Sequence, residues 1–120
     1  MPHDFIHVEI PSANLQRAAT FYHEVFGWKM NYVEEADYML FETGGNINGA
    51  FYHSPQHTGR QGVVVYIAVE DISHTLEQAQ QRGGATVVTR TPVDEMGSFA
   101  LFSDPDGNVL GIWEGNQEEG

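Results

Sequence analysis

The sequence predicts an α+β protein in which one βαβββ unit occurs twice in tandem. Three observations support this: strand and helix patterns follow the same order in both halves, two helix caps recur at a constant spacing, and a glycine ends each helix. The caps Asn14 and Asp71 are 57 residues apart (71 − 14), as are Gly27 and Gly84 (84 − 27). One helix covers one face of each sheet, so two units are expected to form a curled mixed sheet around a concave cup.

The first module, about residues 4–54, opens with a strand of alternating character. Ile6, Val8 and Ile10 fall on one face, while His7 and Glu9 fall on the other. Asn14 then caps a helix whose apolar residues recur at helical spacing and which ends at Gly27. The remaining strands of this module are predicted at 28–33, 37–42 and 49–53.

The second module, about residues 63–114, repeats the pattern after a polar linker at 55–62. A strand at 63–69 precedes a helix that Asp71 caps, and a further strand (85–89) and a loop (91–97) follow. The module ends in a hairpin, because Asp104-Pro105-Asp106-Gly107 has the residues of a type I turn and lies between two apolar runs. The tail at 115–120 is expected to be solvated.

Composition limits the classes of function. The 120 residues suit one domain spanning 1–120, and 41% hydrophobic content suffices for a packed core. Five Lys and Arg against 17 Asp and Glu give a net charge of −12, which argues against nucleic acid and anionic membrane as partners. There is no cysteine, no apolar run of membrane-spanning length and no signal-peptide pattern, so a cytoplasmic protein is expected.

The repeat also predicts which side chains face the cup. The offset of 57 residues between the caps makes Val64 the counterpart of His7 in the second module. Aligning the last strands of the two modules makes Glu114 the counterpart of Tyr52. The more uniformly apolar faces of the first strands suit the helices. His7 and Glu9 in one module, and Val64 and Tyr66 in the other, are therefore expected on the concave side, and a one-residue slip would reverse each assignment.

Several motifs carry a family likeness over nearly the whole chain. They are His7-Val8-Glu9-Ile10, the helix end 21–28, the run 69–72, Gly83-Gly84, and 104–108 through Trp113-Glu114. In this order they resemble the glyoxalase/bleomycin resistance/dioxygenase (vicinal oxygen chelate, VOC) superfamily, in the branch related to lactoylglutathione lyase. The resemblance implies the VOC fold, a small-molecule ligand and a homodimer.

The resemblance also implies a site. In metal-using relatives four positions converge in the cup, and on this chain they are His7, Tyr52, Val64 and Glu114. His7 and Glu114 would hold a divalent ion (Zn, Ni, Fe or Mn) or act as catalytic groups, with Glu9 as a further ligand. Val64 cannot ligate, so glyoxalase I or extradiol dioxygenase activity is not expected. The alternative is a lost site that holds no metal, in which His7 and Glu114 hydrogen-bond each other.

Two functions remain open at this point. The first is a glyoxalase-like lyase or isomerase, metal-assisted or not, in which Glu9, Tyr52, Tyr66 and Phe99 contact the substrate. The second is a non-catalytic protein that sequesters an organic compound, as bleomycin-resistance relatives do. Aromatic residues around the cup suit a flat or amphipathic molecule in either case. Trp113 alternates with Glu114 along the last strand and is expected to fill the core instead.

Overall fold

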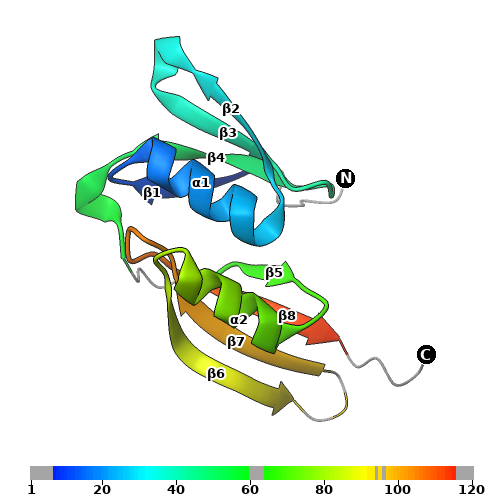
Figure 1. The fold of residues 1–120 in the computed structure, drawn as a ribbon. Helices are drawn as coiled ribbons and strands as arrows, with labels where there is room; N and C mark the ends of the chain where they lie inside the picture. The colour runs from blue at the N-terminus through cyan, green and yellow to red at the C-terminus, as the bar shows by residue number, and fades with distance from the viewer. Residues whose placement is uncertain (1–6, 60–63, 94, 96, 116–120) are drawn as a thin grey trace. The chain divides into compact units, whose positions relative to one another are not determined.

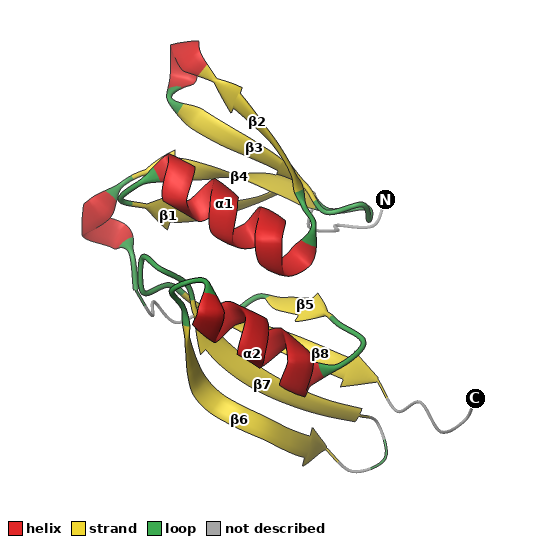
Figure 2. Cartoon of the chain, viewed as in Figure 1, coloured by secondary structure: helices red, strands yellow, loops and turns green. Residues whose placement is uncertain are grey.

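The computed structural model describes residues 7–59, 64–93, 95 and 97–115. They form two compact units, one within residues 1–58 and the other within 59–120. Each unit is a four-stranded mixed sheet with one helix on one face (Figures 1 and 2). The prediction of two tandem βαβββ modules is therefore confirmed.

The first unit has four strands in the order β1-β4-β3-β2, in which β1 runs parallel to β4 and the other pairs are antiparallel. Two short 3₁₀ turns, Glu34–Ala36 and Pro55–His57, follow β2 and β4. The bounds of the strands and the helix are β1 His7–Ser12, α1 Leu15–Phe26, β2 Lys29–Val33, β3 Tyr38–Glu42 and β4 Asn48–His53.

Local chemistry fixes both ends of α1. The Asn14 side chain accepts a hydrogen bond from the Arg17 backbone N–H at 3.0 Å, as an N-cap does. Gly27 adopts a φ of 76° and donates its N–H to the His23 carbonyl at 2.8 Å. The buried face of α1 presents Tyr22 to Phe51 of β4, with ring centroids 5.0 Å apart. The helix therefore covers the face of the sheet on which Phe51 and Ile10 lie.

The second unit repeats this topology, with the strand order β5-β8-β7-β6. Strand β5 runs parallel to β8, and the remaining pairs are antiparallel. The bounds are β5 Tyr66–Ala68, α2 Ile72–Gln81, β6 Ala85–Val93, β7 Gly97–Ser103 and β8 Val109–Gly115. Ile72 of α2, Ala100 and Phe102 of β7 and Ile112 of β8 are each 0% exposed and form the core under the helix.

The predicted cap and turn of this unit are also confirmed. Asp71 accepts the His74 backbone N–H at 3.1 Å. In the hairpin, Gly107 donates its N–H to the Asp104 carbonyl at 2.9 Å, which closes the turn between β7 and β8. The buried Asp104 carboxylate accepts the backbone N–H groups of Asp106 and Asn108, both at 2.9 Å. The turn thus fixes where β8 begins.

Two predicted elements differ from the structure by more than one residue at a strand end. The expected loop at 91–97 is mostly strand, because β6 continues to Val93 and pairs with the start of β7. Pro92 and Gly97 favoured a loop, but β6 is the edge of its sheet, where proline is tolerated. Strand β5 is shorter than the expected 63–69. The predicted strand residues 5–6 and 63, the linker residues 60–62 and the tail from 116 lie outside the described residues.

Candidate functional site

The strand pairing shows which residues share the uncovered face of the first sheet, which we call the first open face. Ile10 is 6% exposed and lies beside Phe51 under α1, so its odd-numbered neighbours His7 and Glu9 point to the opposite side. Tyr38 and Tyr52 lie directly opposite each other on β3 and β4 and share that side. The expected placement of His7, Glu9 and Tyr52 away from the helix agrees with this register.

Three side chains meet on the first open face. Tyr38 donates its hydroxyl hydrogen to the Glu9 carboxylate. His7 Nε2 lies 3.3 Å from the Tyr38 hydroxyl oxygen and 3.4 Å from Glu9 Oε2. The side chains of His7 and Glu9 are 43% and 46% exposed. An imidazole, a phenol and a carboxylate are therefore in mutual contact and open to solvent.

The electrostatics of this cluster keep Tyr38 protonated. Its hydrogen bond to Glu9 raises the pKa of Tyr38 above the ordinary value of 10.0, and partial burial and the negative charge of Glu9 act in the same direction. A phenol held in this way is a hydrogen-bond donor to whatever oxygen it contacts. The contacts thus join Tyr38, His7 and Glu9 into a hydrogen-bonded group that the sequence did not predict.

The uncovered face of the second sheet, which we call the second open face, contains an apolar pocket. Its volume is about 330 Å³, and its walls are Tyr66, Val93, Phe99 and Trp113. The rings of Tyr66 and Phe99 are 6.4 Å apart at an angle of 71°. Phe99 lies directly opposite Trp113 across the β7–β8 pair. The predicted ligand contacts Tyr66 and Phe99 thus lie side by side.

Glycine at position 111 makes room for the Tyr66 ring. Tyr66 pairs with Gly111 across β5 and β8, and a Cβ at Gly111 would overlap the ring carbons Cε2 and Cδ2 of Tyr66. No side chain larger than hydrogen fits beneath the ring in this position. The Tyr66 wall of the pocket therefore depends on a glycine in the neighbouring strand.

The last strand is shifted by one residue relative to the predicted alignment. Tyr52 pairs with Tyr38 in the first unit, and Trp113 pairs with Phe99 at the equivalent place in the second. Trp113, not Glu114, is therefore the counterpart of Tyr52, and the expectation that Trp113 fills the core is wrong. The equal spacing of the two aromatic pairs, 14 residues in each (52 − 38 and 113 − 99), is a sequence signal that gives the correct alignment.

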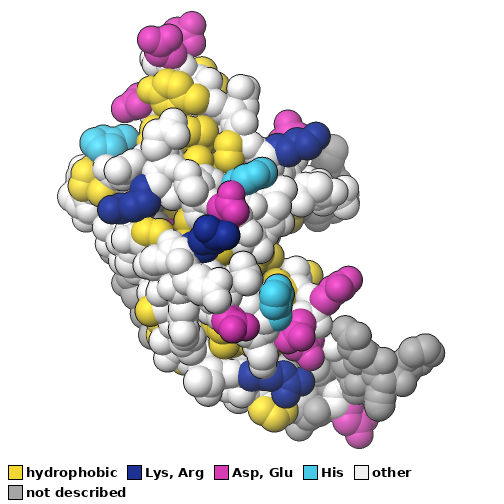
Figure 3. Space-filling model, in the orientation of Figure 1, with side chains coloured by type: hydrophobic (Ala, Val, Ile, Leu, Met, Phe, Trp, Pro, Cys, Tyr) yellow, Lys and Arg dark blue, Asp and Glu magenta, His cyan; other side chains and the backbone are white. Residues whose placement is uncertain are grey.

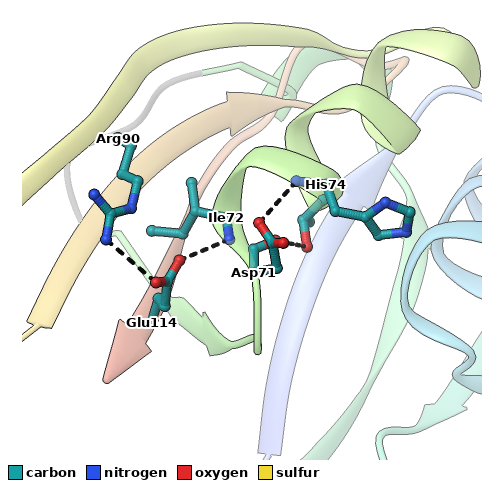
Figure 4. Close-up of polar contacts among 6 residues, drawn as sticks. Asp71, Ile72, His74, Arg90 and Glu114 are labelled. Atoms are coloured by element: carbon teal, nitrogen blue, oxygen red, sulfur yellow. Dashed lines mark hydrogen bonds and ion pairs between the residues drawn. The ribbon is translucent and has the colours of Figure 1, made fainter. Parts of the chain in front are cut away.

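Glu114 faces the helix side of its sheet (Figure 4). One carboxylate oxygen accepts the backbone N–H of Ile72, the first residue of α2, at 2.9 Å, and the other lies 3.3 Å from the Arg90 guanidinium. The Ile72 N–H and the Arg90 side chain together lower the pKa of the Glu114 carboxyl, although burial and Asp71 oppose the shift. The carboxylate thus stabilises the N-terminus of α2, and the expectation that it points with Tyr66 into a cup is wrong.

These positions limit where a metal could bind within each unit. Among residues 7–59, 64–93, 95 and 97–115, no three His, Asp or Glu side chains lie close enough together to hold an ion. His7 and Glu9 offer two donors, Val64 precedes β5 and has no donor atom in its side chain, and Glu114 binds Ile72 and Arg90. Within either unit, this donor set does not fit a tightly bound divalent ion.

Comparison with known proteins identifies relatives. The family model described as "Glyoxalase/Bleomycin resistance protein/Dioxygenase superfamily" matches residues 4–112. A glyoxylase-like domain-containing protein from Didymella fabae is 28% identical over an alignment of 115 positions, which covers 88% of each chain.

Solved structures share the fold at low identity. The fosfomycin resistance protein FosX from Listeria monocytogenes has a TM-score of 0.81 at 16% identity, covering 99% of this chain and 96% of its own. A glyoxalase-related enzyme from Fulvimarina pelagi has a TM-score of 0.75 at 15% identity, covering 94% and 88%. In the described part of the chain, neither helix is long and apolar enough to cross a membrane.

Proposed function

Because the chain belongs to the Glyoxalase/Bleomycin resistance protein/Dioxygenase superfamily, we propose that it binds a small organic molecule in the pocket of the second open face. The observation that supports this most strongly is the set of aromatic and aliphatic walls formed by Tyr66, Val93, Phe99 and Trp113. Ligand sites are mostly apolar concavities with rigid aromatic walls. A pocket of about 330 Å³ is at the small end of the range for organic ligands.

The proposed ligand is a compact, ring-bearing or branched organic molecule. Rings that meet at 71° favour a ligand that can pack against two planes at once. The described walls contain no charged side chain, so recognition rests on shape and on contact with the ring faces. This function needs neither a metal nor a reaction, and it corresponds to the sequestration alternative.

A neutral fluorescent probe tests this function. N-phenyl-1-naphthylamine is apolar and uncharged, so the net charge of −12 neither attracts nor repels it. Replacing Tyr66 with Ser removes one wall of the pocket and should weaken probe binding about tenfold, the effect of losing one aromatic contact of about 1.4 kcal/mol. Energy transfer from tryptophan to the bound probe gives a second signal, and its decrease in Trp113→Phe would separate Trp113 from Trp28, the other tryptophan of the chain.

The matched control is Tyr32→Ser. Tyr32 and Tyr66 are 47% and 49% exposed, so both variants remove the same side chain at the same accessibility, and Tyr32 lies on β2 in the first unit. Tyr32→Ser should bind the probe as the wild type does. Equal affinity of all three proteins for the probe would contradict binding at the pocket.

The cluster on the first open face favours a second candidate function, a lyase or isomerase that moves a proton next to a carbonyl. Tyr38 would turn its hydroxyl hydrogen from Glu9 to the carbonyl oxygen, and the released Glu9 carboxylate or His7 would accept the proton from the neighbouring carbon. Exchange of the carbon-bound hydrogens of hydroxyacetone for deuterium, followed by NMR, tests this directly. Tyr38→Phe should reduce any acceleration at least tenfold, while Tyr32→Phe should leave it unchanged.

Metal-assisted chemistry is the alternative for that second function. Elemental analysis of the purified protein and of His7→Ala distinguishes the two. A stoichiometric Zn, Ni, Fe or Mn ion that is lost on substitution would favour the metal, and deuterium exchange by metal-free protein would favour the side chains alone. Glu114 is part of neither proposal, because both of its oxygens are engaged at α2 and Arg90. A homodimer and a cytoplasmic location are expected with either function.

A further inference from the structure

We propose that the pocket on the second open face selects ligands that carry a compact organic cation, such as a quaternary ammonium group, over neutral ligands of the same shape. This inference rests on the proposed small-molecule function and specifies the class of ligand. Three aromatic side chains, Tyr66, Phe99 and Trp113, line one pocket. The face of an aromatic ring carries partial negative charge and attracts cations, and groups of such rings bind quaternary ammonium ions.

The geometry suits such a cage. Tyr66 and Phe99 form two walls whose planes meet at 71°, with centroids 6.4 Å apart. Trp113, the ring type that binds cations best, lies opposite Phe99 in the adjacent strand. Val93 supplies an aliphatic wall. A tetrahedral group with methyl substituents has the curved shape that walls at a steep angle can contact from several sides.

The basic side chains described in the second unit are elsewhere. Arg90 pairs with Glu114 on the helix side of the sheet. Arg82 is the C-cap residue of α2. No described wall of the pocket therefore carries a positive charge that would repel a cation.

The charge of the whole protein acts in the same direction. Seventeen acidic residues against five basic ones raise the local concentration of cations around the molecule and lower that of anions. Figure 3 shows the acidic side chains scattered over the face in view, not gathered in one patch. This long-range attraction is screened by salt, whereas contact between a cation and a ring face is short-range. Ionic strength can thus separate the two contributions.

The test compares two ligands of nearly identical shape, phenyltrimethylammonium and its neutral analogue tert-butylbenzene. Both compete with N-phenyl-1-naphthylamine for the wild-type protein at high ionic strength, where long-range attraction is screened. The ammonium should bind about tenfold more tightly than the neutral analogue. Equal or tighter binding of tert-butylbenzene would overturn the proposal while leaving the pocket itself intact.

Leucine variants test which rings produce the preference for the cationic ligand. Trp113→Leu and Tyr66→Leu keep an apolar side chain but remove the ring, so each should reduce the ratio of the two affinities toward one. Tyr66 is 49% exposed, so its variant is expected to fold even where Trp113→Leu does not. Tyr32→Leu, on β2, should keep the wild-type ratio. An unchanged ratio in Tyr66→Leu would show that the preference arises elsewhere and would overturn the cage.

The same data separate failure of the cage from failure of the proposed function. If the neutral probe and both ligands fail to bind, the pocket is not a ligand site and both proposals are wrong. If the neutral probe and tert-butylbenzene bind through Tyr66 while the ammonium is excluded, small-molecule binding is retained and the choice of a cation is wrong.

Discussion

Replacing Glu114 with Gln should destabilise the second unit by about 1 kcal/mol at neutral pH. The side-chain amide oxygen of this variant can still accept the Ile72 N–H, so the loss is limited to charge. The interaction of a carboxylate with a helix N-terminus contributes about 0.3–1 kcal/mol. The pair with Arg90 adds about 0.5 kcal/mol at most, since that guanidinium is 48% exposed.

Replacing Glu114 with Ala should cost more, about 2–3 kcal/mol. This variant also leaves the N–H of Ile72, a residue that is 0% exposed, without its carboxylate partner. Urea unfolding followed by circular dichroism measures both variants against the wild type. Glu77→Gln is the matched control, because it also removes one carboxylate charge, and Glu77 lies within α2, away from the helix N-terminus. Its effect should stay below about 0.5 kcal/mol.

The effect of Glu114 should depend on pH in one direction. Its pKa is lowered by folding from the ordinary value of 4.5, so the folded protein binds fewer protons than the unfolded chain. The stabilisation is fully present above pH 4.5 and is lost as the pH falls through the lowered pKa. The difference between wild type and Glu114→Gln should therefore shrink in acid. A constant difference from about pH 7 to about pH 3, or no difference from Glu77→Gln at neutral pH, would refute the reasoning.

Three further predictions concern other features of the two units. Gly111→Ala should displace the Tyr66 ring and weaken N-phenyl-1-naphthylamine binding severalfold, while the circular dichroism spectrum stays unchanged. Full affinity for the probe would mean that the ring has no role in the pocket. Glu9→Gln should move the pKa of Tyr38 down toward 10.0 in an ultraviolet titration, with Tyr38→Phe to assign the signal, and an unmoved titration would argue against the Glu9 contact. Asp104→Ala should lower the free energy of unfolding by about 2–3 kcal/mol, because two backbone N–H groups lose their acceptor, and urea unfolding with no loss would contradict that.

Features set by neighbouring residues could be predicted from the sequence. Asn14, Asp71 and Gly27 act through backbone groups within four residues, so their residue types alone indicate where the helices begin and end. The turn at Asp104 is local in the same sense. The order of elements follows from these signals, and the tandem architecture follows from their repetition.

The candidate site could be predicted in part. His7, Glu9 and Tyr52 fall on the expected side, because one alternating strand and one buried neighbour settle the register. The face on which Glu114 lies depends on the exact register of β8 relative to the turn. The predicted alignment was shifted by one residue, so it assigned the face of Trp113 to Glu114 and that of Glu114 to Trp113. The place of Val93 in the pocket was not predicted, because Pro92 indicated a loop where the edge strand β6 in fact continues.

The contact of Tyr38 with Glu9 could not be predicted from either residue alone. Tyr38 lies on β3 and Glu9 on β1, with β4 between them, so their side chains meet across an intervening strand. No local pattern in the sequence encodes such a pair. Long-range side-chain contacts of this kind depend on the sheet order, which becomes known only with the fold.

Strand β5 carries Tyr66, one wall of the pocket, and is held by few hydrogen bonds. This strand is three residues long and lies at the edge of its sheet. Two backbone hydrogen bonds of 2.9 Å flank it: the Gly111 N–H donates to the Val65 carbonyl, and the Val69 N–H donates to the Trp113 carbonyl. Short edge segments open at low free energy. A ligand packed against Tyr66 would hold this segment in place and would slow hydrogen exchange at the amides of Gly111 and Val69 before it altered the rest of the protein.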